Sequence, residues 1–157
     1  MEIVKLLLAT GNAHPEYQDT KCDSALIWAC YHDNMEIVKL LLATGNAHPE
    51  YQDTNGNSAL MYACVNQNTK IVRKCVLLDT GNAHPEYQDT KGYSALLWAC
   101  DGEKPNTYIV RILLDTGNAH PEYQNTDGNS ALIWACKYNN IEIVRKMRII
   151  RYWKRSS

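Results

Sequence analysis

The chain has 157 residues, 45% of them hydrophobic and 21% charged, which fits one folded domain and excludes a chain that is disordered by composition. Sixteen basic and seventeen acidic side chains nearly balance, which argues against a surface built as a whole for nucleic acid or anionic lipid. No apolar run reaches the roughly 18 residues of a membrane span, and no signal-peptide pattern opens the chain.

A repeated sequence organises the whole chain. The string TGNAHPEYQ begins at Thr10, Thr44, Thr80 and Thr116, with spacings of 34, 36 and 36 residues. Residues 1–20 and 35–54 are identical, which indicates recent duplication. We therefore expect a single domain, 1–157, that divides into a half unit, 1–9, four units of about 10–43, 44–79, 80–115 and 116–152, and a basic tail, 145–157.

The first expected element is a helix in the half unit. Ile3, Val4, Leu6 and Leu7 give it an apolar face, but no helix precedes it to cover that face. Three explanations stay open: the chain is a fragment of a longer array, the first helix frays, or this end self-associates. Because the start duplicates a later segment, a fragment or a truncated gene copy is the first choice.

Each full unit then consists of an irregular finger and two short helices. Ser24 is placed to cap the first helix, because its hydroxyl can accept from a free N–H of the first turn. The equivalent serines are Ser58, Ser94 and Ser130. Apolar residues lie on one face of the second helix, and Gly45 is placed to end it in the left-handed region. The Pro- and Gly-containing stretch over residues 46–57 predicts a finger with a turn at its tip.

Three irregularities distinguish the units. Cys22 stands where the later fingers carry a glycine at the tip, and we expect it to distort the first turn. The stretch from Ile71 to Thr80 is two residues longer than the stretch from Ile37 to Thr44, which predicts that the second helix of unit 44–79 bulges or starts earlier. Unit 80–115 has two extra residues between its helices, which predicts an enlarged surface loop over residues 101–108.

The finger, the two short helices and the period near 34 resemble the ankyrin repeat. Tetratricopeptide units, by contrast, have longer helices and a short turn. The resemblance rests on Asp53, Gly56, Ser58, Leu60, Ala63, Ile71, Val72, Leu77, Leu78 and Gly81 and recurs in each unit. The string Ser-Ala-Leu-Ile-Trp-Ala-Cys is further similar to the divergent ankyrin arrays of giant viruses that infect amoebae. The resemblance implies an all-α solenoid of helix-turn-helix units joined by hairpin-like fingers.

The cysteines could form disulfides or bind a metal, but their positions in the repeat argue against both. Cys30, Cys64, Cys100 and Cys136 occupy the same position in successive units. Stacked helices lie roughly 8–10 Å apart, whereas a disulfide needs Cα atoms within about 7 Å. We expect a buried column of reduced thiols, as in an intracellular, cytoplasmic protein (host cytoplasm if viral). Cys22 is the best candidate for an exposed, reactive thiol.

The same spacing argument applies to the histidines. His14, His48, His84 and His120 recur once per finger, too far apart to share a zinc ion whose ligands lie within about 2.1 Å. We expect them to pack beside the neighbouring Pro and Tyr, with no metal and no cofactor. The sequence contains no nucleotide-binding or hydrolase motif, so we expect no enzyme, and a thiol enzyme is a remote alternative.

The positions that vary among near-identical units predict the binding surface. In ankyrin-like folds, the finger tips and the ends of the first helices line a concave groove that grips partner proteins. The candidate partner-binding residues are Lys21, Asp23, Asn55, Asn57, Lys91, Tyr93, Asp127 and Asn129 at the tips, and Tyr31, His32, Val65, Asn66, Asp101, Lys137 and Tyr138 at the helix ends. Tyr31, Tyr93 and Tyr138 are the expected anchors, because aromatic side chains dominate interface energetics. Neutral drift on a solvated face is the alternative.

The C-terminal tail allows a second function. Its basic residues are Arg145, Lys146, Arg148, Arg151, Lys154 and Arg155, and no acid lies among them. They form either a solvated last helix or an electrostatic contact for nucleic acid, anionic membrane or an acidic partner. The leading hypothesis is thus a non-catalytic protein-binding module that uses the groove, and the second is binding of nucleic acid or membrane through this tail.

Overall fold

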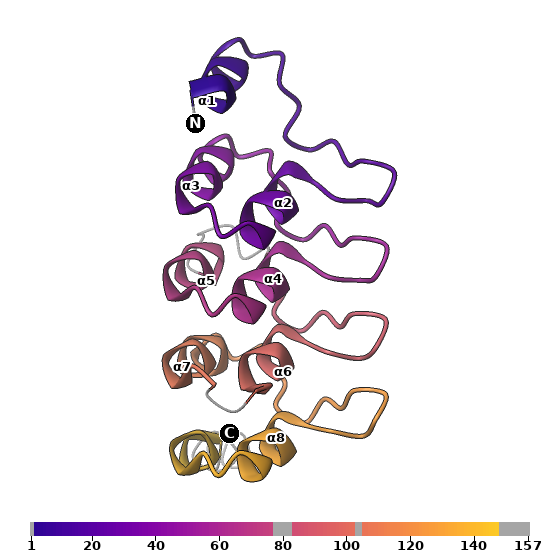
Figure 1. Cartoon of the computed structure of the whole chain (residues 1–157), viewed down its shortest axis with the longest axis vertical. Helices are drawn as coiled ribbons and strands as arrows, with labels where there is room; N and C mark the ends of the chain where they lie inside the picture. Colours follow the sequence, from indigo (N-terminus) through magenta and orange to yellow (C-terminus); the bar gives the residue numbers. More distant parts are fainter. Residues whose placement is uncertain (1, 77–82, 103–104, 148–157) are drawn as a thin grey trace.

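The computed structural model describes residues 2–76, 83–102 and 105–147. Over these residues, short helices stack in two columns along the molecule, and the fingers project to one side (Figure 1). The first helices of the full units are α2 (Ala25–Tyr31), α4 (Ala59–Val65), α6 (Ala95–Cys100) and α8 (Ala131–Lys137). The other column contains α1 (Glu2–Ala9), α3 (Met35–Ala43), α5 (Thr69–Val76), α7 (Thr107–Asp115) and a helix at residues 141–147. The predicted all-α solenoid with hairpin-like fingers is confirmed.

Side-chain caps start both kinds of helix. Ser24, Ser58, Ser94 and Ser130 each accept at Oγ from the N–H three residues later, at 3.2–3.4 Å, as predicted. The second helices use asparagine instead, which was not predicted from the sequence. The Oδ1 atoms of Asn34, Asn68, Asn106 and Asn140 accept in the same way, at 3.0–3.3 Å. Each full unit therefore has two polar caps, which determine the residues at which its two helices begin.

The expected distortion at Cys22 is wrong. Its N–H donates to the Asp19 carbonyl at 2.9 Å, which is also the distance from the Gly56 N–H to the Asp53 carbonyl. Cys22 makes the same turn because it adopts a φ of 60°, in the left-handed region that costs an ordinary residue roughly 1–2 kcal/mol. Gly56 has a further reason to be glycine, since a Cβ atom there would lie 2.9 Å from the Asp89 Cα.

The two predictions about the length irregularities have different outcomes. Helix α5 begins directly after its Asn68 cap, as α3 begins after Asn34, so the predicted earlier start is wrong. The alternative, a bulge, concerns residues 77–82, which lie outside the described residues. The loop between α6 and α7 is enlarged as predicted but ends earlier, at residue 106, because Asn106 caps α7 and brings Tyr108 into that helix. Residues 103–104 of this loop lie outside the described residues.

The thiol column is buried only in part. Cys30, Cys64 and Cys100 are buried, and so is Cys75, but Cys136 is exposed, which corrects the prediction. The side of α8 that faces away from α6 is not covered by the described residues, so Leu132 and Ile133 are exposed as well. Their counterparts in the first full unit, Leu26 and Ile27, lie buried in α2, which packs against α4.

The first helix lacks cover, as predicted. Helices α1 and α3 have the same sequence, yet the Leu7 side chain is 54% exposed and its counterpart Leu41 is 3% exposed. The difference arises because α2 packs against α3, whereas the described residues contain no equivalent partner for α1. Ile3 and Leu6 are exposed on the same helix.

Candidate functional site

In the second and third full units, one carboxylate joins the finger to the first helix. The Oδ1 atom of Asp53 accepts from the backbone N–H groups of Asn55 and Asn57, both at 2.8 Å, which holds the tip turn. Its Oδ2 atom accepts from the Tyr62 hydroxyl of α4 at 2.7 Å. Burial and this hydrogen bond raise the pKa of Tyr62, so the hydroxyl stays protonated as the donor.

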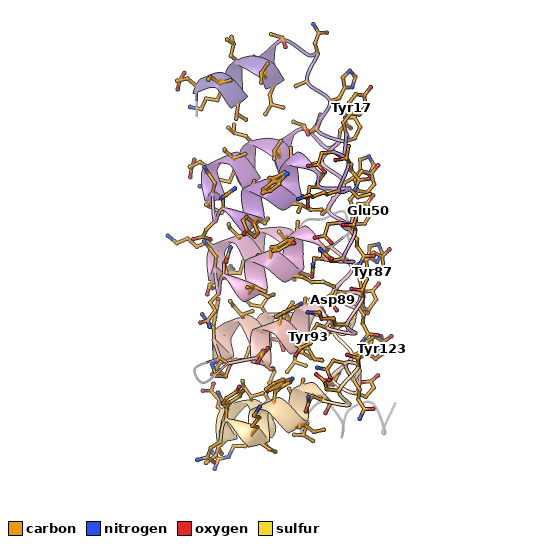
Figure 2. All side chains as sticks on the ribbon, turned by 45° about the vertical axis from the view of Figure 1, so that its right-hand side comes forward. Tyr17, Glu50, Tyr87, Asp89, Tyr93 and Tyr123 are labelled. Atoms are coloured by element: carbon orange, nitrogen blue, oxygen red, sulfur yellow. The ribbon has the colours of Figure 1, made fainter. Side chains whose placement is uncertain are left out.

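The third full unit uses the same arrangement with different chemistry. Asp89 Oδ1 accepts from the backbone N–H groups of Lys91 and Tyr93, and its Oδ2 atom accepts from Trp98 Nε1 at 3.3 Å. Tyr93 in turn stacks on Trp98, with ring centroids 4.4 Å apart. In Figure 2, Asp89 and Tyr93 lie on the side of the fingers that is nearer to the helices.

The fourth full unit breaks the arrangement. Asn125 replaces the aspartate, and its Oδ1 atom accepts from the N–H groups of Asp127 and Asn129 at 3.1 and 2.9 Å. Its Nδ2 group and Trp134 Nε1 are then two buried donors without a hydrogen-bond partner among the described residues. The side chains are 5% and 7% exposed, so this unit holds its finger less firmly.

The fingers are also joined to one another. The N–H groups of Thr54, Thr90 and Thr126 each donate to a carbonyl in the preceding finger, at 2.8–3.0 Å. Backbone bonds between fingers leave little freedom for one tip to move relative to the next. The tips therefore present a pre-organised surface.

Two adjacent hollows open between the fingers and the first helices. The first has a volume of about 190 Å³ and is lined by Lys21, Asp23, Ile27, Trp28, Tyr31, Asp53, Thr54, Asn55 and Tyr62. The second has a volume of about 360 Å³ and is lined by Asn55, Asn57, Met61, Tyr62, Val65, Asp89, Thr90, Lys91 and Trp98. Asn55 and Tyr62 line both, so the two hollows form one groove across three units.

The structure places all fifteen predicted partner-binding residues at least partly in solvent, and seven of them line this groove. These seven are Lys21, Asp23, Tyr31, Asn55, Asn57, Val65 and Lys91, and Tyr93 adjoins them through its stacking on Trp98. The others extend the surface beyond it: His32, Asn66, Asp101, Asp127, Asn129, Lys137 and Tyr138. Asn66 also has a structural role, since its Nδ2 group donates to the Cys30 and Tyr31 carbonyls at the end of α2.

A row of aromatic residues also belongs to the groove, a position that was not predicted from the sequence. Trp28, Tyr62 and Trp98 line the two hollows, and the Trp28 side chain is 42% exposed. Their pairing with the finger aspartates leaves a signal in the sequence, because the hydrogen-bonded residues are always nine positions apart. Trp134 belongs to the same row, and Lys137 Nζ lies 4.3 Å from its ring centroid.

The histidines form a separate row along the outer edge of the fingers. His14, His48, His84 and His120 each stack on the tyrosine three residues later, with centroids 4.6–4.8 Å apart. Figure 2 shows Tyr17, Tyr87 and Tyr123 along this edge. Each Nδ1 atom also lies 2.7–2.9 Å from a glutamate. Among the described residues, no three His, Cys, Asp or Glu side chains converge to hold a metal ion.

The buried thiols are held in their protonated form. A hydrogen bond with Cys75 and burial raise the pKa of Cys30, and burial raises the pKa of Cys100 to about 12. Thiols of this kind are poor nucleophiles, because the reactive species is the thiolate.

Within the described part of the tail, Arg145 is exposed and Lys146 Nζ lies 2.6 Å from Asp115 Oδ1. Arg148, Arg151, Lys154 and Arg155 lie outside the described residues.

A comparison with protein families agrees with this geometry. The family described as ankyrin repeats (3 copies) matches residues 1–81 and 74–149. The chain belongs to the ankyrin repeat family. Ankyrin repeats are in general protein-protein interaction modules, and proteins built from them are typically non-enzymatic. A search of curated proteins finds no match, and no helix in the described part of the chain is long and apolar enough to cross a membrane.

Proposed function

We propose that this ankyrin repeat protein is a non-catalytic module that holds a segment of a partner protein in the groove. The observation that carries the proposal is the pair of adjoining hollows with exposed aromatic walls, Trp28 at 42% and Tyr31 at 52% exposure. Aromatic side chains at the centre of an interface, surrounded by polar groups, supply most of the binding energy in protein complexes. Lys21, Asn55 and Lys91 provide such a polar rim.

The rigid finger row supports the same proposal. Binding costs free energy whenever loops or side chains must be ordered, and the cost is smaller when the surface is already in place. Here the hydrogen bonds of Thr54, Thr90 and Thr126 join the fingers, and Asp53 and Asp89 join the fingers to the helices. The groove therefore needs little reorganisation to receive an extended segment.

The test replaces the three anchor tyrosines by residues that other units carry at the same positions. The triple variant is Tyr31→Val, Tyr93→Asn and Tyr138→Asn, which copies Val65, Asn57 and Asn66. We expect the wild-type chain to capture a protein from lysate and the variant to lose it, with thermal unfolding monitored by circular dichroism as the control for folding. Unchanged capture by the folded variant would contradict the groove as the binding surface.

The second candidate, binding of nucleic acid or anionic membrane through the basic tail, is supported by the exposed Arg145. Lys146 is less available, because it pairs with Asp115. The same capture experiment separates the candidates. Retention of the partner after nuclease treatment and after removal of residues 148–157 supports the groove, whereas loss under either condition supports the tail.

Two further properties are proposed with this function. An intracellular, cytoplasmic location is supported by the six free cysteines, because oxidising compartments favour disulfides. If the resemblance to giant-virus arrays reflects the origin of the chain, that compartment is the host cytoplasm. Self-association at the N-terminal half unit is supported by the exposed Ile3, Leu6 and Leu7. Sedimentation velocity over a range of concentrations tests it, since a constant monomer mass would contradict it.

A further inference from the structure

The two hollows of the groove are copies of one site, displaced by one unit, and the lining of the first is the more acidic and the more aromatic. Corresponding wall residues are Lys21 and Asn55, Asp23 and Asn57, Trp28 and Tyr62, Tyr31 and Val65, Asp53 and Asp89, Thr54 and Thr90, and Tyr62 and Trp98. The decisive differences are at two positions. Where the first hollow has Asp23 and Tyr31, the second has the neutral Asn57 and the aliphatic Val65.

Three aromatic rings form the wall of the first hollow. The Tyr31 ring is nearly perpendicular to Trp28, with centroids 5.6 Å apart and planes at 83°. It is also nearly perpendicular to Tyr62, with centroids 5.4 Å apart and planes again at 83°. The ring faces carry partial negative charge, so rings set at right angles around a hollow attract a cation from more than one direction.

Carboxylates add to the negative potential of this hollow. Asp23 and Asp53 line it, and Asp19 is near enough to act on Asp23, while Lys21 is the one basic residue among its described lining residues. The Asp53 carboxylate already accepts hydrogen bonds from the Tyr62 hydroxyl and from two backbone N–H groups. Asp23 is different, since no hydrogen bond or ion pair of its carboxylate is found among the described residues. Burial, together with Asp19 and Asp53, raises the pKa of Asp23, which means that its charge is incompletely balanced.

We propose that the hollow between the first two fingers binds one cationic side chain of the partner, an arginine or a lysine with or without methyl groups. The cation lies against Trp28, Tyr31 and Tyr62 and pairs with Asp23. This inference rests on the proposed function, because the cation belongs to the segment held in the groove. It adds a position of specificity to that function: the partner has a basic residue opposite the first hollow and a neutral one opposite the second.

The probes are the single amino acids in capped form: N-acetyl-arginine amide, N-acetyl-lysine amide and its trimethylated form, with N-acetyl-citrulline amide as the neutral isostere of arginine. Each is titrated into the full chain, and the indole N–H resonance of Trp28 is followed by NMR. We expect saturable, weak binding of at least one cation and no saturation with citrulline. The relative affinities of the three cations identify which side chain the hollow prefers.

The matched variants are Asp23→Asn and Tyr31→Val, which copy the second hollow into the first. Each is expected to weaken cation binding about threefold or more, and the double variant to abolish it. Folding is expected to persist, because the second unit carries these residues at the same positions and because Asn removes a carboxylate whose ionised form is disfavoured in the folded state. The reverse variant, Asn57→Asp with Val65→Tyr, should create a second cation site, detected at the Trp98 indole.

Three results would overturn the inference: no binding of any of the cations, equal binding of citrulline and the cations, or undiminished cation binding by the double variant. Failure here is distinguishable from failure of the proposed function. If the Tyr31, Tyr93 and Tyr138 variant loses the captured partner while no cation binds the wild-type chain, the groove function stands and the cation site is wrong. If neither the partner nor a cation depends on the groove residues, both proposals are wrong.

Discussion

At the scale of single residues, small changes at one repeated position alter how firmly a finger is held. Asp53 and Asp89 each hold the tip turn with one oxygen and an aromatic donor with the other. Asn125 retains the first contact but offers an N–H₂ group where an acceptor is needed. Because all units share one backbone pattern, the chain contains its own controls for this substitution.

Replacing Asn125 by aspartate should stabilise the protein. The new carboxylate would accept from Trp134 Nε1 and remove two unpartnered buried donors, for a gain of about 1–2 kcal/mol in the free energy of unfolding. The control is Asp89→Asn, which removes the acceptor of Trp98 Nε1 and should destabilise by a similar amount. Urea denaturation measures both, and a midpoint that falls for Asn125→Asp would contradict the explanation.

The tip residues offer a second comparison. Cys22→Gly should stabilise by roughly 0.5–1 kcal/mol, because glycine adopts the φ of 60° without the steric cost paid by cysteine. Gly56→Ala should lower the free energy of unfolding by about 1–3 kcal/mol, because its Cβ would lie 2.9 Å from the Asp89 Cα and the next finger would have to move. Equal denaturation midpoints for these two variants would rule out this account of the tips.

At the scale of helices, sequence alone does not decide burial. Helices α1 and α3 have identical residues, and only α3 packs against a first helix. Isolated helices of eight or nine residues are marginal in water, so their stability comes from packing of the apolar face. The buried Leu41 and the exposed Leu7 show the consequence in one molecule.

Hydrogen exchange should therefore separate these two helices. We expect the amides of α1 to exchange at least about tenfold faster than the corresponding amides of α3, because α1 can open without disturbing the stack. The measurement is native-state exchange followed by NMR, which compares each residue with its identical counterpart 34 positions later. Intrinsic exchange rates cancel in that comparison. Equal protection of α1 and α3 would show that α1 is covered in solution.

At the scale of the whole molecule, stacking decides which repeated side chains meet solvent. The same cysteine position is buried in α2, α4 and α6 and exposed in α8. The same stacking joins the fingers into one row and aligns the two hollows along it. Burial and binding surface are thus properties of neighbouring units, and a single unit has neither.

Thiol labelling measures directly which cysteines are buried and which are exposed. In the native protein we expect Cys22 and Cys136 to react rapidly with N-ethylmaleimide, because both are exposed. Cys30, Cys64, Cys75 and Cys100 should react only on unfolding, because they are buried. Mass spectrometry of the labelled peptides gives the result. Rapid labelling of Cys64 without denaturant would show that the stack opens more readily than its packing indicates.

The sequence determined the class of fold, the spacing of the repeat and the serine caps of the first helices. These features are local: a hydroxyl caps the helix that follows it, and a glycine ends the helix that precedes it. The sequence did not reveal that the aromatic row lines the groove, that Cys136 is exposed or that Cys22 fits into an undistorted turn. Only the tertiary structure decided these, because the burial of a side chain and the shape of a hollow depend on which neighbours stack against it. The tertiary structure likewise shows that Asp23 and Tyr31 line one hollow and that Asn57 and Val65 line the next, because stacking places each pair between two fingers.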